Sequence, residues 1–254
     1  MSNAATLVEF HLRSMWNWRS LYYGRVLEPL VFFSFLVAGV GGLTGDVEVY
    51  GSRLPYLVFA FPGVVALLTL RAWATTVADV ANDRKWGVYA LARIRGLGLR
   101  HYAASIVAAG SVVAVTQAVL VYVLLCILAH GLGAGRLLAM ALGLGLSLAS
   151  WLCFGVALGM AIDSYHRRDL VLSLATLPLA FTAPLFWRVE AAPAYLRTLS
   201  LVNPLRYHVS LLRGLLVGHV DVAALAVTGA CLPVALGVLA WSGRRAELLS
   251  GEHG

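Results

Sequence analysis

Six long apolar stretches constrain this chain more than any other feature of its sequence. They run over residues 26–43, 55–78, 104–128, 137–160, 170–188 and 222–242, and Pro178 and Pro184 interrupt the fifth. A transmembrane helix needs about 20 apolar residues. Within lipid only helices or closed barrels satisfy every backbone polar group, and barrel strands are shorter and alternate in polarity. The sequence therefore predicts an all-α polytopic membrane protein with six transmembrane helices.

The composition excludes the main soluble classes. Apolar residues make up 60% of the 254 residues and charged residues 12%, against roughly 25% charged residues in soluble domains. This excludes an ordinary soluble enzyme, a disordered tail and a nucleic-acid binder. No linker or second module interrupts the pattern, so we expect residues 1–254 to form a single transmembrane domain.

Basic residues predict the orientation of the chain. If the amino terminus is cytoplasmic, the inner segments hold twelve Lys and Arg residues and the outer segments six. Positive residues favour the cytoplasmic side, so both termini are predicted to lie inside. Arg is far commoner than Lys, and with the abundant Ala and Gly this is typical of a GC-rich bacterial genome. We therefore expect a multi-pass protein of a bacterial inner (cytoplasmic) membrane.

The amino-terminal residues 1–25 predict a helix along the inner membrane face. Leu7, Phe10, Ser14, Trp18 and Leu21 recur at helical spacing, and an amphipathic helix with aromatic residues suits the headgroup zone. The alternative is a plain lead-in to the first span.

Motifs for catalysis and metal binding are missing from the sequence. There is no GxxxxGK[ST] phosphate loop, no HExxH and no GxSxG. The three Cys residues lie singly in apolar runs, where Cys is usually a small buried hydrophobe. We therefore expect no catalytic residues, no metal site and no cofactor bound by this chain.

Charges within the predicted spans are also nearly absent. Glu28 lies near the inner end of the first span, and Arg71 lies about two turns from the inner end of the second, where it could snorkel. An ion-driven transporter normally needs a polar site near the midplane. The pattern therefore points to an energy source outside this chain.

Two segments between spans are too long for simple loops. Residues 79–101 are polar and carry Trp86, Tyr89, Ala90, Ile94 and Leu97 on one helical face, which predicts a helix that packs on the bundle or on a partner protein. A surface-lying connector is the alternative.

The second segment, residues 189–219, is moderately apolar and contains an Asn-Pro helix start at 203–204. It predicts two short helices that dip into the outer leaflet and return. A structured outer cap without a gating role is the alternative.

Four short motifs occur in a recognisable order. They are Glu28-Pro29-Leu30 before Gly39–Gly42, the run from Tyr56 to Gly63, the stretch from Asp83 to Gly87, and Pro193 followed by Asn203 to Tyr207 and Arg213. Together they resemble the ABC-2 type transporter permeases, in particular the branch of the nodulation-factor exporter permease and the daunorubicin-resistance membrane proteins. The chain departs from that pattern at Val88-Tyr89, where the family usually has an acidic residue, and at Phe186-Trp187, where it usually has Phe-Pro.

The resemblance implies an architecture and partners. It implies six spans, an amphipathic amino-terminal helix, a cytoplasmic coupling helix in 79–101 and an outer re-entrant hairpin in 189–219. Two such permeases, identical or paralogous, would sit in membrane lipid on two ABC ATPase subunits that bind ATP and Mg. The chain would then be the permease of an exporter for a lipid-like, glycoconjugate or amphipathic drug substrate.

The resemblance also assigns site residues. Those expected to contact the ATPase are Asn82, Asp83, Arg84, Lys85, Trp86, Gly87, Tyr89 and Leu91. Those expected in the outer gate are Phe186, Trp187, Asn203, Pro204, Leu205, Arg206, Tyr207 and Arg213. Those expected along the translocation path are Glu28, Phe61, Pro62, Gly63 and Arg71.

Two other classes remain open from the residues alone. A self-contained channel or secondary transporter would transport from this chain without a partner. A membrane enzyme acting on lipid would need a polar cluster. The chain offers only the residues Asp163, His166, Arg167, Arg168 and Asp169. These are more simply interpreted as a short inner loop.

Overall fold

The computed structural model describes residues 3–17, 19–129 and 131–251, and these are mostly helical. Five segments among them are long and apolar enough to cross a membrane, where the sequence predicted six. The five are Tyr22–Thr44, Tyr56–Lys85, Leu99–Leu128, Ala134–Ala161 and Val222–Arg244.

The difference lies at the predicted span 170–188. Helix α8 (Tyr165–Thr182) occupies this part of the chain and ends at Thr182. Its first turns carry Arg167, Arg168 and Asp169, so its apolar part is shorter than a bilayer-crossing helix requires. Residues 183–188, which were predicted to continue the span, form no helix.

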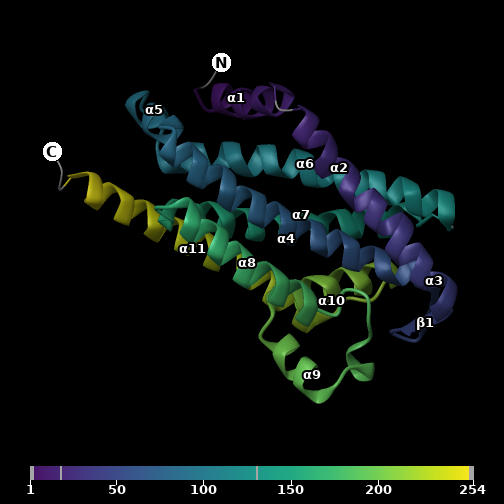
Figure 1. Ribbon diagram of the computed structural model, residues 1–254. Helices are drawn as coiled ribbons and strands as arrows, with labels where there is room; N and C mark the ends of the chain where they lie inside the picture. The colour runs from purple at the N-terminus through teal and green to yellow at the C-terminus, as the bar shows by residue number, and fades with distance from the viewer. Residues whose placement is uncertain (1–2, 18, 130, 252–254) are drawn as a thin grey trace.

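Helix α4 (Tyr56–Lys85) is the centre of the bundle and the most buried of the five segments. It packs chiefly on α7 (Ala134–Ala161) and α6 (Leu99–Leu128), and α7 in turn packs on α11 (Val222–Gly251) (Figure 1). Gly155 and Gly159 of α7 face α4, because a Cβ on either would lie within 3 Å of Thr76 or Val80. Small residues four apart let two helix backbones approach closely.

The amino-terminal part crosses the outside of this core. Helix α1 (Asn3–Asn17) packs on α6, and α2 (Arg19–Val31) continues through a π-helical turn (Phe32–Val37) into α3 (Ala38–Thr44). Of the predicted amphipathic pattern, Trp18 lies outside the described residues. A β-hairpin of β1 (Asp46–Val49) and β2 (Ser52–Pro55) follows, with Val47 opposite Leu54. In the sequence this segment is only the connection between the predicted spans 26–43 and 55–78.

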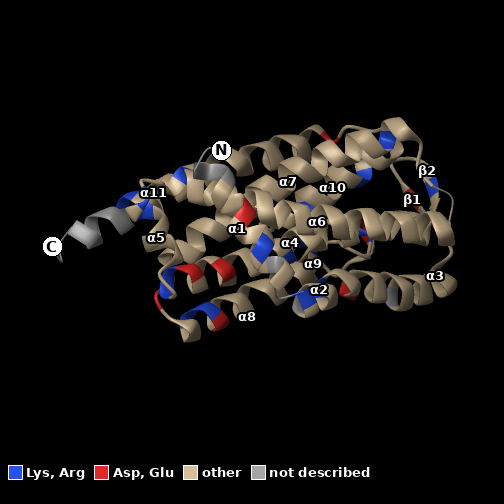
Figure 2. Cartoon of the chain, turned by 90° about the horizontal axis from the view of Figure 1, so that it is seen from above, with Lys and Arg blue, Asp and Glu red and all other residues tan. Residues whose placement is uncertain are grey.

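The long helices alternate in direction, so the bundle has two distinct ends. The first, here called the α5 end, holds α5 (Val88–Ile94), the α7–α8 connection and the last turns of α11; the second, the hairpin end, holds β1 and β2. Charged residues are most frequent at the α5 end and sparser through the rest of the bundle (Figure 2).

The predicted outer segment contains two short helices. A 3-10 turn (Val189–Ala191) leads to α9 (Ala194–Leu201), and α10 (Pro204–Val217) then packs among α4, α7 and α11. Helix α10 is mostly buried in the protein.

Candidate functional site

The last turn of α4 is bound to the protein's own helices. Asn82 accepts a hydrogen bond from Arg168 (3.0 Å), and Asp83 accepts one from the Tyr102 hydroxyl (2.8 Å). Arg84 donates to the backbone oxygens of Met160 and Ile162 and lies 3.7 Å from Asp163. The Lys85 ammonium lies 3.8 Å from the centre of the Tyr165 ring. These four residues, predicted to meet an ATPase, thus join α4 to α6, to the end of α7 with the α7–α8 connection, and to the first turn of α8.

Helix α5 is a separate element that presents an apolar surface outward. Gly87, at φ 78°, adopts the left-handed conformation that separates α5 from α4. Trp86, Leu91 and Ile94 are exposed to 67%, 51% and 83%, and we call these three residues the α5 face.

The inner side of the same helix packs on the bundle. Tyr89 lies 5.0 Å from the Tyr102 ring, and Ala92 and Leu97 are buried. The predicted common face of Trp86, Tyr89 and Leu97 is therefore divided, with Tyr89 and Leu97 facing inward.

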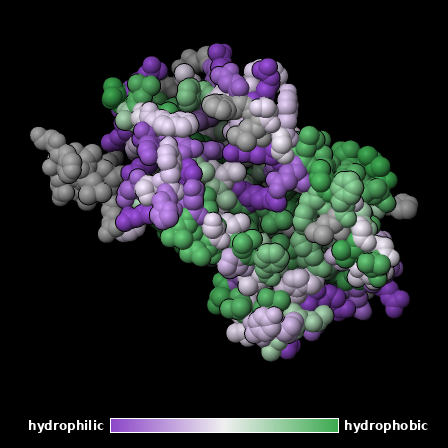
Figure 3. All heavy atoms as spheres, viewed as in Figure 1, coloured by the Kyte–Doolittle hydropathy of each residue, from purple (hydrophilic) through white to green (hydrophobic). Residues whose placement is uncertain are grey.

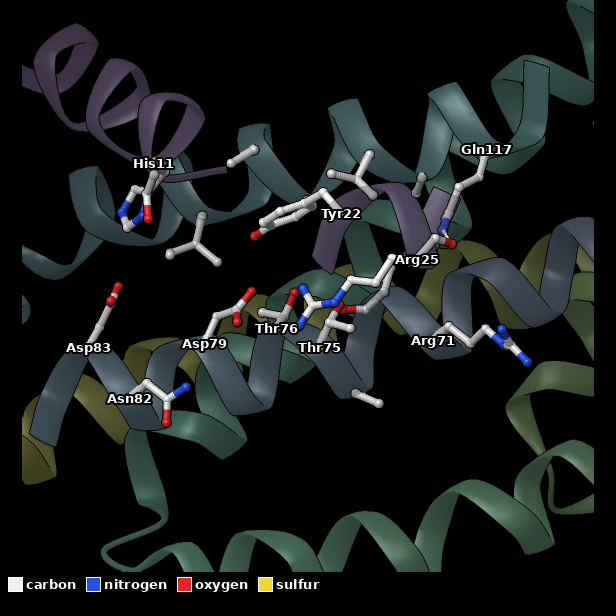
Figure 4. Close-up of a pocket in the computed structure, with 18 of the residues that line it drawn as sticks. His11, Tyr22, Arg25, Arg71, Thr75, Thr76, Asp79, Asn82, Asp83 and Gln117 are labelled. Atoms are coloured by element: carbon white, nitrogen blue, oxygen red, sulfur yellow. Dashed lines mark hydrogen bonds between the residues drawn. The ribbon is translucent and has the colours of Figure 1, made fainter. Parts of the chain in front are cut away.

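A cavity of about 530 Å³ lies between α1, α2, α4 and α6. Asp79, Asp83, Thr75 and Thr76 line it from α4, opposite His11 of α1 and Tyr22 and Arg25 of α2 (Figure 4). From the viewpoint of Figure 1, hydrophilic residues surround a hollow in this half of the molecule, and hydrophobic residues are more frequent on the hairpin half (Figure 3).

The predicted path residues fall into two groups. Glu28 and Arg71 line the cavity and form an ion pair of 2.7 Å. The Arg71 side chain was expected to snorkel toward the inner end of its span. It lies instead near the middle of the 30-residue α4, where it pairs with Glu28. Phe61, Pro62 and Gly63 are instead buried in the core, away from the cavity.

Gly63 and Arg213 meet at one backbone carbonyl. A Cβ on Gly63 would lie 2.0 Å from the Leu185 oxygen. The same oxygen accepts a 2.6 Å hydrogen bond from the buried Arg213, which also donates to the Phe59 oxygen (3.4 Å) and lies 4.0 Å from the centre of the Phe59 ring. This contact, here called the Arg213 clasp, holds residues 183–188 against α4.

The other predicted gate residues connect α8, α9 and α10. The side chain of Asn203 accepts a hydrogen bond from the Leu205 amide (2.9 Å) and donates to the Leu179 oxygen and the Thr182 hydroxyl of α8. Pro204 occupies the first turn of α10, and Leu205 is fully buried.

Arg206 and Tyr207 donate to Ser200 and Leu201, which ties α10 to the end of α9. On the preceding segment, the Phe186 oxygen accepts a hydrogen bond from Tyr56, and Trp187 is half-buried.

The comparison with protein families accounts for nearly the whole of this arrangement. Residues 3–217 match the family model described as ABC-2 type transporter. The chain belongs to this family. A search of curated proteins gives no match.

As an ABC-2 type transporter, the chain is a membrane component of an ABC transporter rather than a catalytic subunit. Among the described residues, no group of three or more His, Cys, Asp or Glu residues could hold a metal ion.

Several residues that organise this ABC-2 transporter were not singled out from the sequence. His11, Asp79 and Gln117 all line the cavity, and the Gly155–Gly159 pair joins α7 to α4. Two signals were available: Asp79 and Asp83 are four residues apart, as are Gly155 and Gly159. Each spacing places a pair on one helix face.

Proposed function

We propose that this chain is the permease of an ATP-driven ABC exporter in a bacterial inner membrane, with both termini in the cytoplasm. Two copies, or this chain and a paralogue, pair in the membrane, and separate ABC ATPase subunits bind ATP and Mg at the α5 end. The cargo is lipid-like, a glycoconjugate or an amphipathic drug. Helix α8, with residues 183–188, completes the sixth passage through the membrane.

The observation that carries the proposal is the α5 face. Three large apolar side chains are exposed on a charged end of the protein, where lipid would not cover them. Exposed apolar patches rimmed by polar groups mark protein interaction sites. The hydrogen bonds of Asn82, Asp83 and Arg84 fix α4 to the bundle, so a force on α5 is transmitted to the central helix rather than absorbed by a loose loop.

The test is co-purification from native membranes with the tagged chain as bait. The unchanged chain should recover a soluble protein that carries a phosphate-loop motif, identified by mass spectrometry. Ile94→Asp should reduce its recovery at least tenfold, because a carboxylate replaces an apolar contact. Val202→Asp is the control, because Val202 is equally exposed (82%) but lies between α9 and α10.

Equal recovery of the ATPase with Ile94→Asp and with Val202→Asp would show that the α5 face is not part of the interface. If the unchanged chain recovers no ATPase and transports from liposomes alone under an ion gradient, it is a secondary transporter or channel.

A further inference from the structure

The cavity between α1, α2, α4 and α6 has an unbalanced set of charges. Glu28 and Arg71 neutralise each other in their ion pair. Of the other charged side chains that line it, Asp79 and Asp83 are acidic and only Arg25 is basic. Arg25 reaches toward Asp79 (Figure 4) and attracts its carboxylate, but the two form no ion-pair contact in the described part of the chain. Arg168, near Asp79, is already bound to Asp169 and Asn82.

Two further groups that line the cavity, Asp83 and His11, can accept hydrogen bonds. Asp83 receives the Tyr102 hydroxyl on one oxygen and has capacity on the other. The Nε2 atom of His11 is buried and has no hydrogen-bond partner among the described residues, and the side chain is 9% exposed. Burial lowers the pKa of His11 to about 4, so the ring is neutral at pH 7 and one of its nitrogens accepts. A buried polar atom without a partner is costly, and in the tautomer that carries its proton on Nδ1 a bound donor would satisfy Nε2.

The remaining walls of the cavity are apolar or aromatic. Helix α6 contributes Ile106, Ala109, Gly110, Val113 and Ala114. Tyr22 supplies an aromatic ring near Asp79 (Figure 4), and aromatic faces attract cations. The volume of about 530 Å³ lies within the range of small-molecule pockets, roughly 300–1,000 Å³.

We propose that this cavity binds an ammonium group carried on an apolar body, with Asp79 as the counter-charge. An ammonium group has three donors and no acceptor, which matches the carboxylates and the unpartnered His11 nitrogen. The apolar body lies along the α6 wall. The ligand is either a cationic amphiphilic cargo or the headgroup of an aminophospholipid, and identifying it with the cargo rests on the proposed permease function.

The test measures binding to the purified full-length chain in nanodiscs of phosphatidylglycerol, without any ATPase. One probe is 1,12-diaminododecane dansylated at one end, which keeps a free ammonium group. Its neutral counterpart is dansylated dodecylamine, which has no second amine. We expect the ammonium probe to bind at least tenfold more tightly.

Asp79→Asn removes the charge with little change in shape and should abolish that tenfold preference. The control is Asp46→Asn on the exposed β1 strand, which should leave both affinities unchanged. Equal binding of the two probes, or an unchanged preference in Asp79→Asn, would overturn the proposal.

A second measurement uses only the unchanged protein and therefore does not depend on the folding of a variant. Dodecylamine should displace the ammonium probe, and dodecanol should not; displacement by both alike would overturn the proposal. Nanodiscs that contain phosphatidylethanolamine distinguish a lipid headgroup from a cargo as the ligand. If this lipid displaces the ammonium probe, the ligand is a lipid headgroup; if the probe binds undiminished, the ligand is a cargo. Since no ATPase is present, a failure here is distinct from a failure to recover an ATPase.

Discussion

Gly63 is the position where one added methyl group should do most damage to the fold. Alanine at this position places a Cβ 2.0 Å from the Leu185 backbone oxygen. A backbone atom cannot rotate away as a side chain does, so α4 and residues 183–188 must separate. Overpacking of this kind typically costs about 1–3 kcal/mol.

The same displacement breaks a second interaction. Leu185 supplies the shorter of the two hydrogen bonds of Arg213, at 2.6 Å, and hydrogen bonds to charged groups contribute about 1.5–3 kcal/mol. We therefore expect Gly63→Ala to lower the free energy of unfolding by about 3–5 kcal/mol. At ~2–4 °C per kcal/mol for a chain of this size, the melting temperature should fall by roughly 6–20 °C.

The assay is a thermal melt of the purified protein in detergent, followed by the loss of the monodisperse peak. Gly145→Ala in α7 is the matched control, because no atom lies within 4 Å of a Cβ at that helical position. It should melt at or slightly above the temperature of the unchanged protein, since Ala favours a helix over Gly by up to ~1 kcal/mol.

A double-mutant cycle tests the reason as well as the size of the effect. Arg213→Lys shortens the reach of the cation and removes the planar donor pair, so Gly63→Ala should cost at least ~1 kcal/mol less in that background. A fall of less than about 3 °C for Gly63→Ala, or strictly additive effects in the cycle, would refute the Arg213 clasp.

Three further predictions use the same melt or hydrogen exchange. Gly159→Ala should lower the melting temperature by roughly 4–10 °C, because the new Cβ would lie 2.7 Å from the nearest atom of α4. Gly145→Ala is again the control. Equal melting temperatures of the two variants would contradict the close α4–α7 packing. Glu28→Gln should destabilise the protein by leaving Arg71 unpaired, and adding Arg71→Gln should restore part of the loss; no recovery in the double variant would contradict the pair. The docking of α1 should be complete near pH 7 and weaken as the pH falls from about 6.5 toward 4, because the lowered pKa of His11 means that protonation favours the undocked helix. Hydrogen exchange of residues 3–17, corrected for intrinsic rate, should show this weakening. The variant His11→Phe should remove the pH dependence.

Hydrophobicity alone identified most of the fold. Five of the six predicted spans coincide with long apolar helices, because a helix in lipid must be apolar along most of its length. The span 170–188 was the exception because its apolar residues continue beyond the helix: α8 stops at Thr182, just before Ala183 and Pro184. The β-hairpin was not predicted, since each strand has only four residues.

The helix of the second predicted span continues past the apolar run, because polarity does not distinguish water from a polar partner. Residues 79–85 were predicted to begin a cytoplasmic segment, and α4 continues through them as helix to Lys85. The polar groups of Asn82, Asp83 and Arg84 are satisfied by partners 19 to 86 residues away in sequence. A sequence without known contacts cannot reveal such pairings, and the cavity that Asp79 and Asp83 line was hidden for the same reason.

The continuity of α4 links the separate parts of the proposed transporter. One 30-residue helix carries Gly63 at the Arg213 clasp, Arg71 in its ion pair, Asp79 in the cavity and, in its last turn, the contacts that fix the α5 end. A helix rises 1.5 Å per residue, so the clasp and Asp79 are about 24 Å apart along one rigid element. In the proposed complex, a displacement of α5 by the ATPase would therefore move the acidic wall of the cavity together with the contact that holds residues 183–188. Variants at Gly63 should for this reason alter ligand affinity at Asp79 even though the two sites share no contact.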